Sequence, residues 1–208
     1  MKKGEKRKRE LLQIAYRMFL SQGYESTSVD QIIEAAGIAK GTFYYYFQSK
    51  EQMLEAVIGM MIEAEVEAAR QVLASQLPVP QKIAGIISTA RPAQEERPIE
   101  DALNRPENLL MHNKIRDQLL AAILPLLAEA VEEGVRSGIF SCDHIRERVK
   151  MLLILSSELF DEANYTAPEV KVFVDVMETL LGAAPGTMDL VRALIPLEAA
   201  SAEGGETE

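Results

Sequence analysis

The chain has 208 residues, of which 48% are hydrophobic, enough for a packed core and too many for general disorder. No apolar run reaches the roughly 18 residues that a transmembrane helix needs. The basic N-terminus leads into no apolar signal-peptide core, and the single cysteine, Cys142, excludes an intrachain disulfide. These features predict a protein of the reducing cytoplasm.

Charge is divided unevenly along the chain. Residues 1–50 hold nine Lys and Arg against five Asp and Glu, a net charge of +4. Residues 51–208 hold 13 against 27, a net charge of −14. Nucleic acid is therefore an expected partner of the N-terminal part alone, and the acidic remainder should disfavour indiscriminate binding.

The first predicted helix spans residues 5–21, where apolar side chains recur at helical spacing, and it ends at Gly23. Ahead of it, residues 2–9 carry six basic side chains. They form either a solvated tail or an arm whose Lys6, Arg7 and Arg9 reach the DNA backbone or minor groove.

Residues 28–50 predict two short helices joined by a tight turn. Ser28 followed by Gln31 is a capping-box pattern that begins a helix at residue 29, and Gly37 permits the left-handed backbone that ends it. A second helix should run over residues 39–46, and Ser49 with Gln52 repeats the capping pattern for the next one. Two helices around a short turn containing glycine form a helix-turn-helix.

The second helix of this pair has an unusual aromatic run. Phe43 and Phe47 are four residues apart and should form its buried face. The other side offers a small residue, hydroxyls and cations, a set that suits base edges and phosphates. An aromatic plug between helices is the alternative for such a run, but the two phenylalanines already fill that role. Adding the N-terminal cations, we predict these DNA contacts: Ser28, Lys40, Gly41, Thr42, Tyr44, Tyr45, Tyr46, Lys50, Lys6 and Arg7.

The remainder is also helical in pattern, with no strand pattern and no internal repeat. A long helix over residues 49–74 is followed by one over 81–89, and the proline-rich residues 91–108 predict a loop with a short helix at 99–103. Further helices are predicted at the end of the chain: 107–137, kinked or split at Pro125, then 143–163, 168–181 and 187–197, the last capped by Thr187. Residues 201–208 should be a disordered tail.

The helices over 143–163 and 168–181 are apolar on more than one face, which predicts burial on several sides. A second copy of the chain is the simplest partner, through a four-helix bundle. Charged substitutions at Phe173 or Val174 would then separate a core position from an interface position.

The sequence predicts no enzyme, metal or cofactor. Cys142, Asp143 and His144 are adjacent, but Asp143 is better interpreted as a helix cap, and no second ligand pair has matching spacing. His112, Ser156 and Asp161 supply the residue types of a catalytic triad. The sequence has no motif for the strained turn that exposes the nucleophile in such enzymes, so we do not predict a triad.

The N-terminal pattern closely resembles the DNA-binding domain of the tetracycline-repressor-like (TetR) family of bacterial transcription regulators. The resemblance is specific over about the first fifty to sixty residues, and beyond them it concerns architecture only. The matching residues are Phe19, Gly23, Thr27, Ser28, Val29, Ile32, Ala35, Ala36, Gly37, Lys40, Gly41, Thr42, Phe43, Tyr44, Tyr45, Phe47, Lys50 and Leu54.

The resemblance implies an all-α protein with a three-helix DNA-binding domain at residues 1–50 and a larger helical domain at 51–200 for ligand binding and dimerisation. It implies a homodimeric repressor on a palindromic DNA operator, released when a small-molecule effector shifts the fourth helix. From their apolar character we predict that the following residues line a pocket, with ordinary core packing as the alternative for each of them: Met60, Met61, Ile87, Leu110, Met111 and Phe160. The rival interpretations are a helical protein-interaction module without operator binding and an enzyme with its site in the C-terminal domain.

Overall fold

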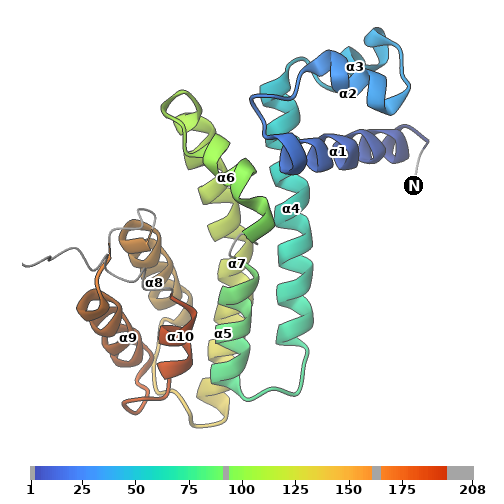
Figure 1. Ribbon diagram of the computed structural model, residues 1–208. Helices are drawn as coiled ribbons and strands as arrows, with labels where there is room; N and C mark the ends of the chain where they lie inside the picture. The colour runs from blue at the N-terminus through green and yellow to red at the C-terminus, as the bar shows by residue number, and fades with distance from the viewer. Residues whose placement is uncertain (1–2, 91–93, 161–164, 196–208) are drawn as a thin grey trace, which may run out of the picture. The chain divides into compact units, whose positions relative to one another are not determined.

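A computed structural model describes residues 3–90, 94–160 and 165–195 of the chain (Figure 1). Regular structure in those residues is entirely helical, which confirms the predicted all-α fold class. None of the helices in these ranges combines the length and hydropathy needed to cross a membrane.

The chain divides into two compact units. The first unit comprises Met1–Glu67 with Ala90–Leu119, and the second comprises Ala68–Thr89 with Leu120–Glu208. Two long helices, α4 (Lys50–Leu73) and α7 (Leu109–Arg136), contribute residues to both units. The division between DNA-binding and ligand-binding domains at residues 50 and 51 stays a prediction.

The first unit is built around the N-terminal helices. It contains α1 (Lys3–Gln22), α2 (Val29–Ala36), α3 (Lys40–Tyr46), the start of α4, a 3₁₀ turn η1 (Gln94–Glu96), α6 (Arg97–Leu103), a second turn η2 (Pro106–Asn108) and the start of α7. Its core holds fully buried side chains from α1, α2, α3 and α4: Leu11, Ala15, Phe19, Ile32, Phe43, Met53, Leu54 and Val57. The predicted bounds of α1 and α4 are confirmed to within two residues, and the expected loop over 91–108 is more helical than predicted.

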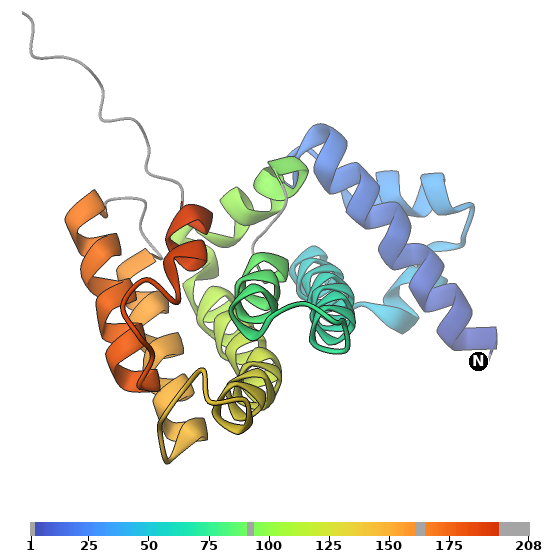
Figure 2. The ribbon, with the colours of Figure 1, turned by 90° about the horizontal axis from the view of Figure 1, so that it is seen from below.

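The second unit contains α5 (Val79–Thr89), α8 (Ile145–Phe160), α9 (Ala167–Leu181) and α10 (Asp189–Leu194), with parts of α4 and α7. Figure 2 shows α8 and α9 side by side. Pro125 does not split α7, contrary to one of the predicted outcomes. It is exposed, so the backbone hydrogen bond that proline cannot make is lost on the solvent side.

Local caps define α9. Thr166 Oγ1 accepts a hydrogen bond from the Glu169 backbone N–H, and the Glu169 carboxylate accepts one from the Thr166 backbone N–H at 2.7 Å. The Thr166 backbone N–H and the Thr166 hydroxyl both donate to the Glu169 carboxylate, and they hold the pKa of Glu169 below its usual range. At the other end Gly182 has φ 61°, and a Cβ there would overlap the Ser141 carbonyl, so only glycine fits.

Two predictions about the C-terminal helices are wrong. Thr187 does not cap α10, because its hydroxyl donates to the Ala184 carbonyl and the helix begins at Asp189. Phe173 and Val174 are buried within the chain itself, so they cannot report on an interface. A helix that is apolar on several faces does not reveal from sequence which face turns inward. The large apolar residues of this pair of helices that are exposed are Met151, Ile154, Leu155 and Val172.

Candidate nucleic-acid interface

The helix-turn-helix begins with the predicted capping box on α2. Ser28 Oγ accepts from the Gln31 backbone N–H at 3.2 Å, and Gln31 Oε1 accepts from the Ser28 N–H at 2.7 Å. Both hydrogen bonds satisfy donors that a helix N-terminus leaves unpaired. The prediction is confirmed for the cap, and the Ser28 hydroxyl already has a structural partner.

The turn between α2 and α3 depends on Gly37. Its backbone is left-handed, with φ 60° and ψ 43°, and the next residue, Ile38, donates its N–H to the Ile33 carbonyl at 3.2 Å. The end of α2 is also held by α1, because Arg7 Nη2 donates to the Ala36 carbonyl at 3.2 Å. This contact positions α2 against α1 within the first unit.

The aromatic run on α3 divides between core and solvent. Phe43 and Phe47 are buried, with ring centroids 5.9 Å apart, as the four-residue spacing predicts. Tyr45 is 79% exposed, Tyr44 is also exposed and Tyr46 is half-buried. The phenylalanines therefore anchor the helix, and the tyrosine hydroxyls of Tyr44 and Tyr45 remain on its outer side.

The N-terminal half of α3 is open to a partner. Gly41 is exposed, and a Cβ placed there would meet no heavy atom within 4 Å, so packing inside the chain does not require glycine. Lys40 Nζ lies 3.2 Å from Asp30 Oδ1, but both side chains are largely exposed. Such an ion pair contributes little and can be exchanged for a phosphate. Thr42 is half-buried beside them.

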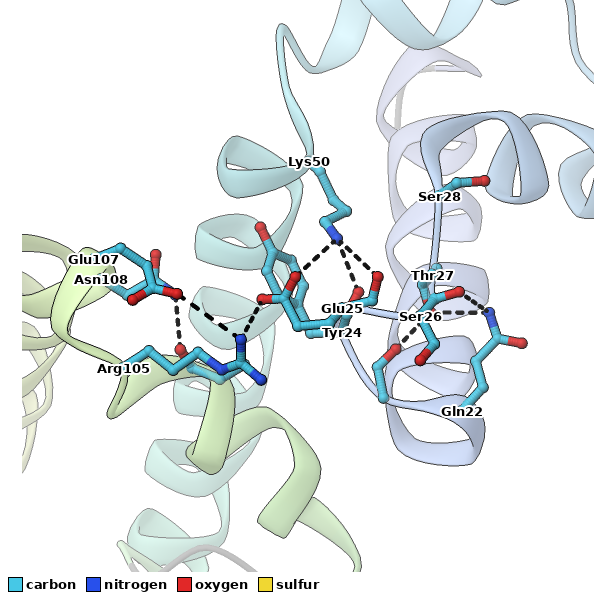
Figure 3. Close-up of polar contacts among 12 residues, drawn as sticks. Gln22, Tyr24, Glu25, Ser26, Thr27, Ser28, Lys50, Arg105, Glu107 and Asn108 are labelled. Carbon is cyan, nitrogen blue, oxygen red and sulfur yellow. Dashed lines mark hydrogen bonds and ion pairs between the residues drawn. The ribbon is translucent and has the colours of Figure 1, made fainter.

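Lys50 differs from its predicted environment. We expected an ammonium group with no internal partner, but Nζ donates to the Tyr24 carbonyl at 3.0 Å and lies 4.1 Å from the centroid of the Tyr24 ring (Figure 3). Its side chain is 19% exposed, and Glu25 is a further acidic neighbour at 3.9 Å. The prediction that Lys50 has no internal partner is wrong. Its partners Tyr24 and Glu25 lie far from it in the sequence, so no local pattern indicates the contact. Lys50 has a structural role, and its contact with DNA stays a prediction.

The N-terminal cations Lys6 and Arg7 lie on a helix, in agreement with the helix predicted over residues 5–21, and the expected tail or arm is helical from Lys3 onward. Helix α1 begins at Lys3, so Lys6 and Arg7 project from a helix, with Lys6 exposed. Arg7 is half-buried and pairs with Glu10 at 2.8 Å in addition to its bond to α2. Their predicted DNA contacts therefore require a helical surface.

Sequence reasoning missed a polar cluster in the loop between α1 and α2. Thr27 is buried, donates its hydroxyl to the Gly23 carbonyl at 2.8 Å and accepts from Gln22 Nε2 at 3.0 Å (Figure 3). Glu25 pairs with Arg105 at 3.2 Å. A local pattern could have indicated the Thr27 contact, whereas nothing in the sequence pairs Glu25 with a residue so far along the chain.

A second polar contact in the first unit joins α1 to η1. The Tyr16 hydroxyl donates to Glu96 Oε1 at 2.8 Å, and burial with this hydrogen bond raises the pKa of Tyr16 to about 12. Burial, with the charge of Glu96 nearby, raises the pKa of Glu65 on α4 to about 7.

The groups considered for metal binding and catalysis have other roles. Asp143 accepts from Arg148 Nη2 at 2.6 Å and therefore anchors α8, instead of capping it as predicted. The Ser156 hydroxyl donates to the Leu153 carbonyl, and Asp161 lies outside the described residues. Burial raises the pKa of the Cys142 thiol. No metal-ligand group of three or more acidic, His or Cys side chains occurs in the ranges that the structure describes.

The predicted pocket residues belong to both units. Met60, Met61 and Met111 are half-buried against the core of the first unit, where Leu110 is 86% exposed. Ile87 and Phe160 belong to the second unit, and the Phe160 ring packs against Tyr165 and Phe173. The ligand pocket stays a prediction.

Comparisons with known proteins identify the N-terminal pattern. Residues 11–57 match the family described as bacterial regulatory proteins, tetR family. The HTH-type transcriptional repressor KstR2 of Mycolicibacterium smegmatis is 35% identical over 91 residues, which span 44% of this chain and 44% of that protein. KstR2 of Rhodococcus jostii is 28% identical over 141 residues, which span 66% of this chain and 69% of that protein. The solved structure of RolR with its ligand resorcinol has a TM-score of 0.61 at 20% identity, covers 96% of this chain and 98% of that one, and shows the fold.

Proposed function

The chain is a DNA-binding regulator of the TetR family, and from that premise we propose that it is a homodimeric repressor whose palindromic operator is released when a small molecule binds. The similar proteins KstR2 are named transcriptional repressors, which supports repression over activation. An operator in bacterial DNA places this action in the cytoplasm.

The exposed side of α3 is the observation that carries the proposal. Phe43 and Phe47 bind the helix to the core, leaving Lys40, Gly41 and Tyr45 outward. A short helix with this composition suits the major groove, where Gly41 permits close approach and hydroxyls and ammonium groups meet phosphates. The predicted DNA contacts on α3 therefore belong to this proposal.

Dimerisation is supported by the outer side of α8 and α9. Met151 is 60% exposed and Val172 is 58% exposed, with Ile154 and Leu155 also exposed on α8. Covering these residues with the same helices of a second copy makes a four-helix bundle. A two-fold dimer presents two copies of α3 to half-sites about 34 Å apart, or a multiple of that distance.

Release by an effector requires a molecule that prefers one arrangement of the dimer over the other. RolR, which shares the fold, has been solved with resorcinol, and this supports a small organic effector for the present chain. We place its site beside the half-buried methionines Met60, Met61 and Met111 of the first unit, because flexible methionine side chains can adapt to an apolar ligand.

Binding to DNA upstream of the protein's own gene tests the proposal. Fluorescence anisotropy should show tighter binding to that duplex than to a scrambled duplex of equal length. Tyr45→Ala should weaken the specific complex without changing the unfolding temperature, because the side chain is exposed. Equal affinity for both duplexes, unchanged by Tyr45→Ala, would favour the protein-interaction alternative.

A further inference from the structure

A bridge of charges joins the loop before α2 to the segment between α6 and α7 (Figure 3). Glu25 Oε1 lies 3.2 Å from Arg105 Nη1, and Glu25 Oε2 lies 3.9 Å from Lys50 Nζ. All three residues belong to the first unit. We call Lys50, Glu25 and Arg105 the Glu25 bridge.

One end of the bridge is able to change partners. Arg105 has an extended backbone, with φ −72° and ψ 144°, at the joint between α6 and η2. Its Nη1 has a second acidic neighbour, Glu107 Oε1, at 3.8 Å. The side chains of both ion pairs are about half exposed, so each pair contributes little to stability. Exchange of Arg105 from one pair to the other therefore costs little free energy. A small rearrangement of the joint would therefore move Arg105 from Glu25 to Glu107.

The other end of the bridge lies in residues 1–50, the predicted DNA-binding domain, which we call the head. The Tyr24 carbonyl, next to Glu25, accepts hydrogen bonds from Lys50 Nζ at 3.0 Å and from the Thr27 backbone N–H at 3.1 Å. The loop then enters α2 at Ser28, a predicted DNA contact. A carboxylate on this loop repels phosphates unless cations compensate it. The bridge carries a net charge of +1 with Arg105 in place and zero without it.

We propose that Arg105 is a positioning residue, which neutralises Glu25 in the operator-binding state and leaves it for Glu107 in the released state. The inference rests on the proposed function, and it names a route by which the segment 105–108 controls the head. Any effector that rearranges this segment would then lower operator affinity by uncovering the Glu25 carboxylate, without touching α3.

A double-mutant cycle on operator affinity tests this coupling. Arg105→Gln should weaken binding by about two- to fivefold, the range of an exposed ion pair. In a Glu25→Gln background the same substitution should have almost no effect, because the charge that Arg105 compensates is gone. Arg97→Gln is the matched control, since Arg97 is an exposed arginine of α6 in the same unit. Its effect should be the same in both backgrounds.

Hydrogen exchange provides a readout that needs no DNA. The Thr27 amide should exchange faster in Arg105→Gln than in the unmodified protein, and Glu25→Gln should abolish that difference. Equal losses of operator affinity from Arg105→Gln in both backgrounds would overturn the proposal. A rate of hydrogen exchange at the Thr27 amide that Arg105→Gln does not change would also overturn it. If neither the unmodified protein nor any variant binds DNA, the proposed function fails. The hydrogen-exchange experiment still shows whether Arg105 acts on the loop at Thr27 through Glu25.

Discussion

Replacing Gly41 by alanine separates DNA contact from folding. Gly41 is the second residue of α3 and is exposed, and a Cβ placed there would meet no heavy atom within 4 Å. Gly41→Ala therefore fits the folded chain without strain. Any loss of operator binding must come from the space that the methyl group takes from DNA.

The two effects have opposite signs. Alanine is favoured over glycine in a helix by about 0.8–1 kcal/mol, an upper bound here because the position lies in the first turn. For a chain of this size the gain corresponds to an unfolding temperature up to about 2–4 °C higher. Operator affinity should fall about five- to 150-fold, since one lost base contact costs about 1–3 kcal/mol.

Thermal unfolding by circular dichroism and operator titration by anisotropy measure the two effects. Gly59→Ala is the matched control, because Gly59 is a helical glycine of α4 whose added Cβ also meets nothing within 4 Å. It should stabilise the protein similarly and leave operator affinity unchanged. Normal operator affinity of Gly41→Ala, or an equal loss in Gly59→Ala, would show that Gly41 does not face the operator.

Three further predictions concern stability and assembly. Lys50→Ala should lower the free energy of unfolding of the head by about 1–2 kcal/mol in urea titrations, because its ammonium holds the α1–α2 loop; an unchanged midpoint would contradict this role. Met151→Glu should give a folded monomer in sedimentation, whereas Val174→Glu should unfold the chain, and a Met151→Glu dimer would move the interface elsewhere. The folded-state pKa of Glu65 is about 7, above its ordinary 4.5, so the folded state binds more protons between these values and stability should fall as pH rises from 4.5 to 7. Glu65→Gln should flatten that slope, and an unaltered slope would exclude Glu65 as its source.

Local signals predicted the helix-turn-helix well. The capping box at Ser28, the left-handed Gly37 and the four-residue spacing of Phe43 and Phe47 all act within one or two helical turns. Their energetics are therefore visible in a short window of sequence. The same holds for the bounds of α4.

Contacts between distant residues were not predictable in this way. Lys50 was expected to be available to DNA, but its partner Tyr24 comes from the preceding loop between other helices. Charged substitutions at Phe173 or Val174 were expected to separate a core position from an interface position, but both side chains are buried, whereas the neighbouring Val172 is exposed. On a helix with several apolar faces, tertiary packing decides which face is buried.

Hydroxyl-radical footprinting on the DNA upstream of the gene shows whether two copies of α3 read a two-fold operator. We expect two protected blocks related by a dyad, with centres about 10–10.5 base pairs apart or at a multiple of that spacing. Gly41→Ala should remove both blocks together, and Gly59→Ala should retain them. A single protected block would exclude a two-fold operator, and protection that survives Gly41→Ala would exclude α3 as the element that reads it.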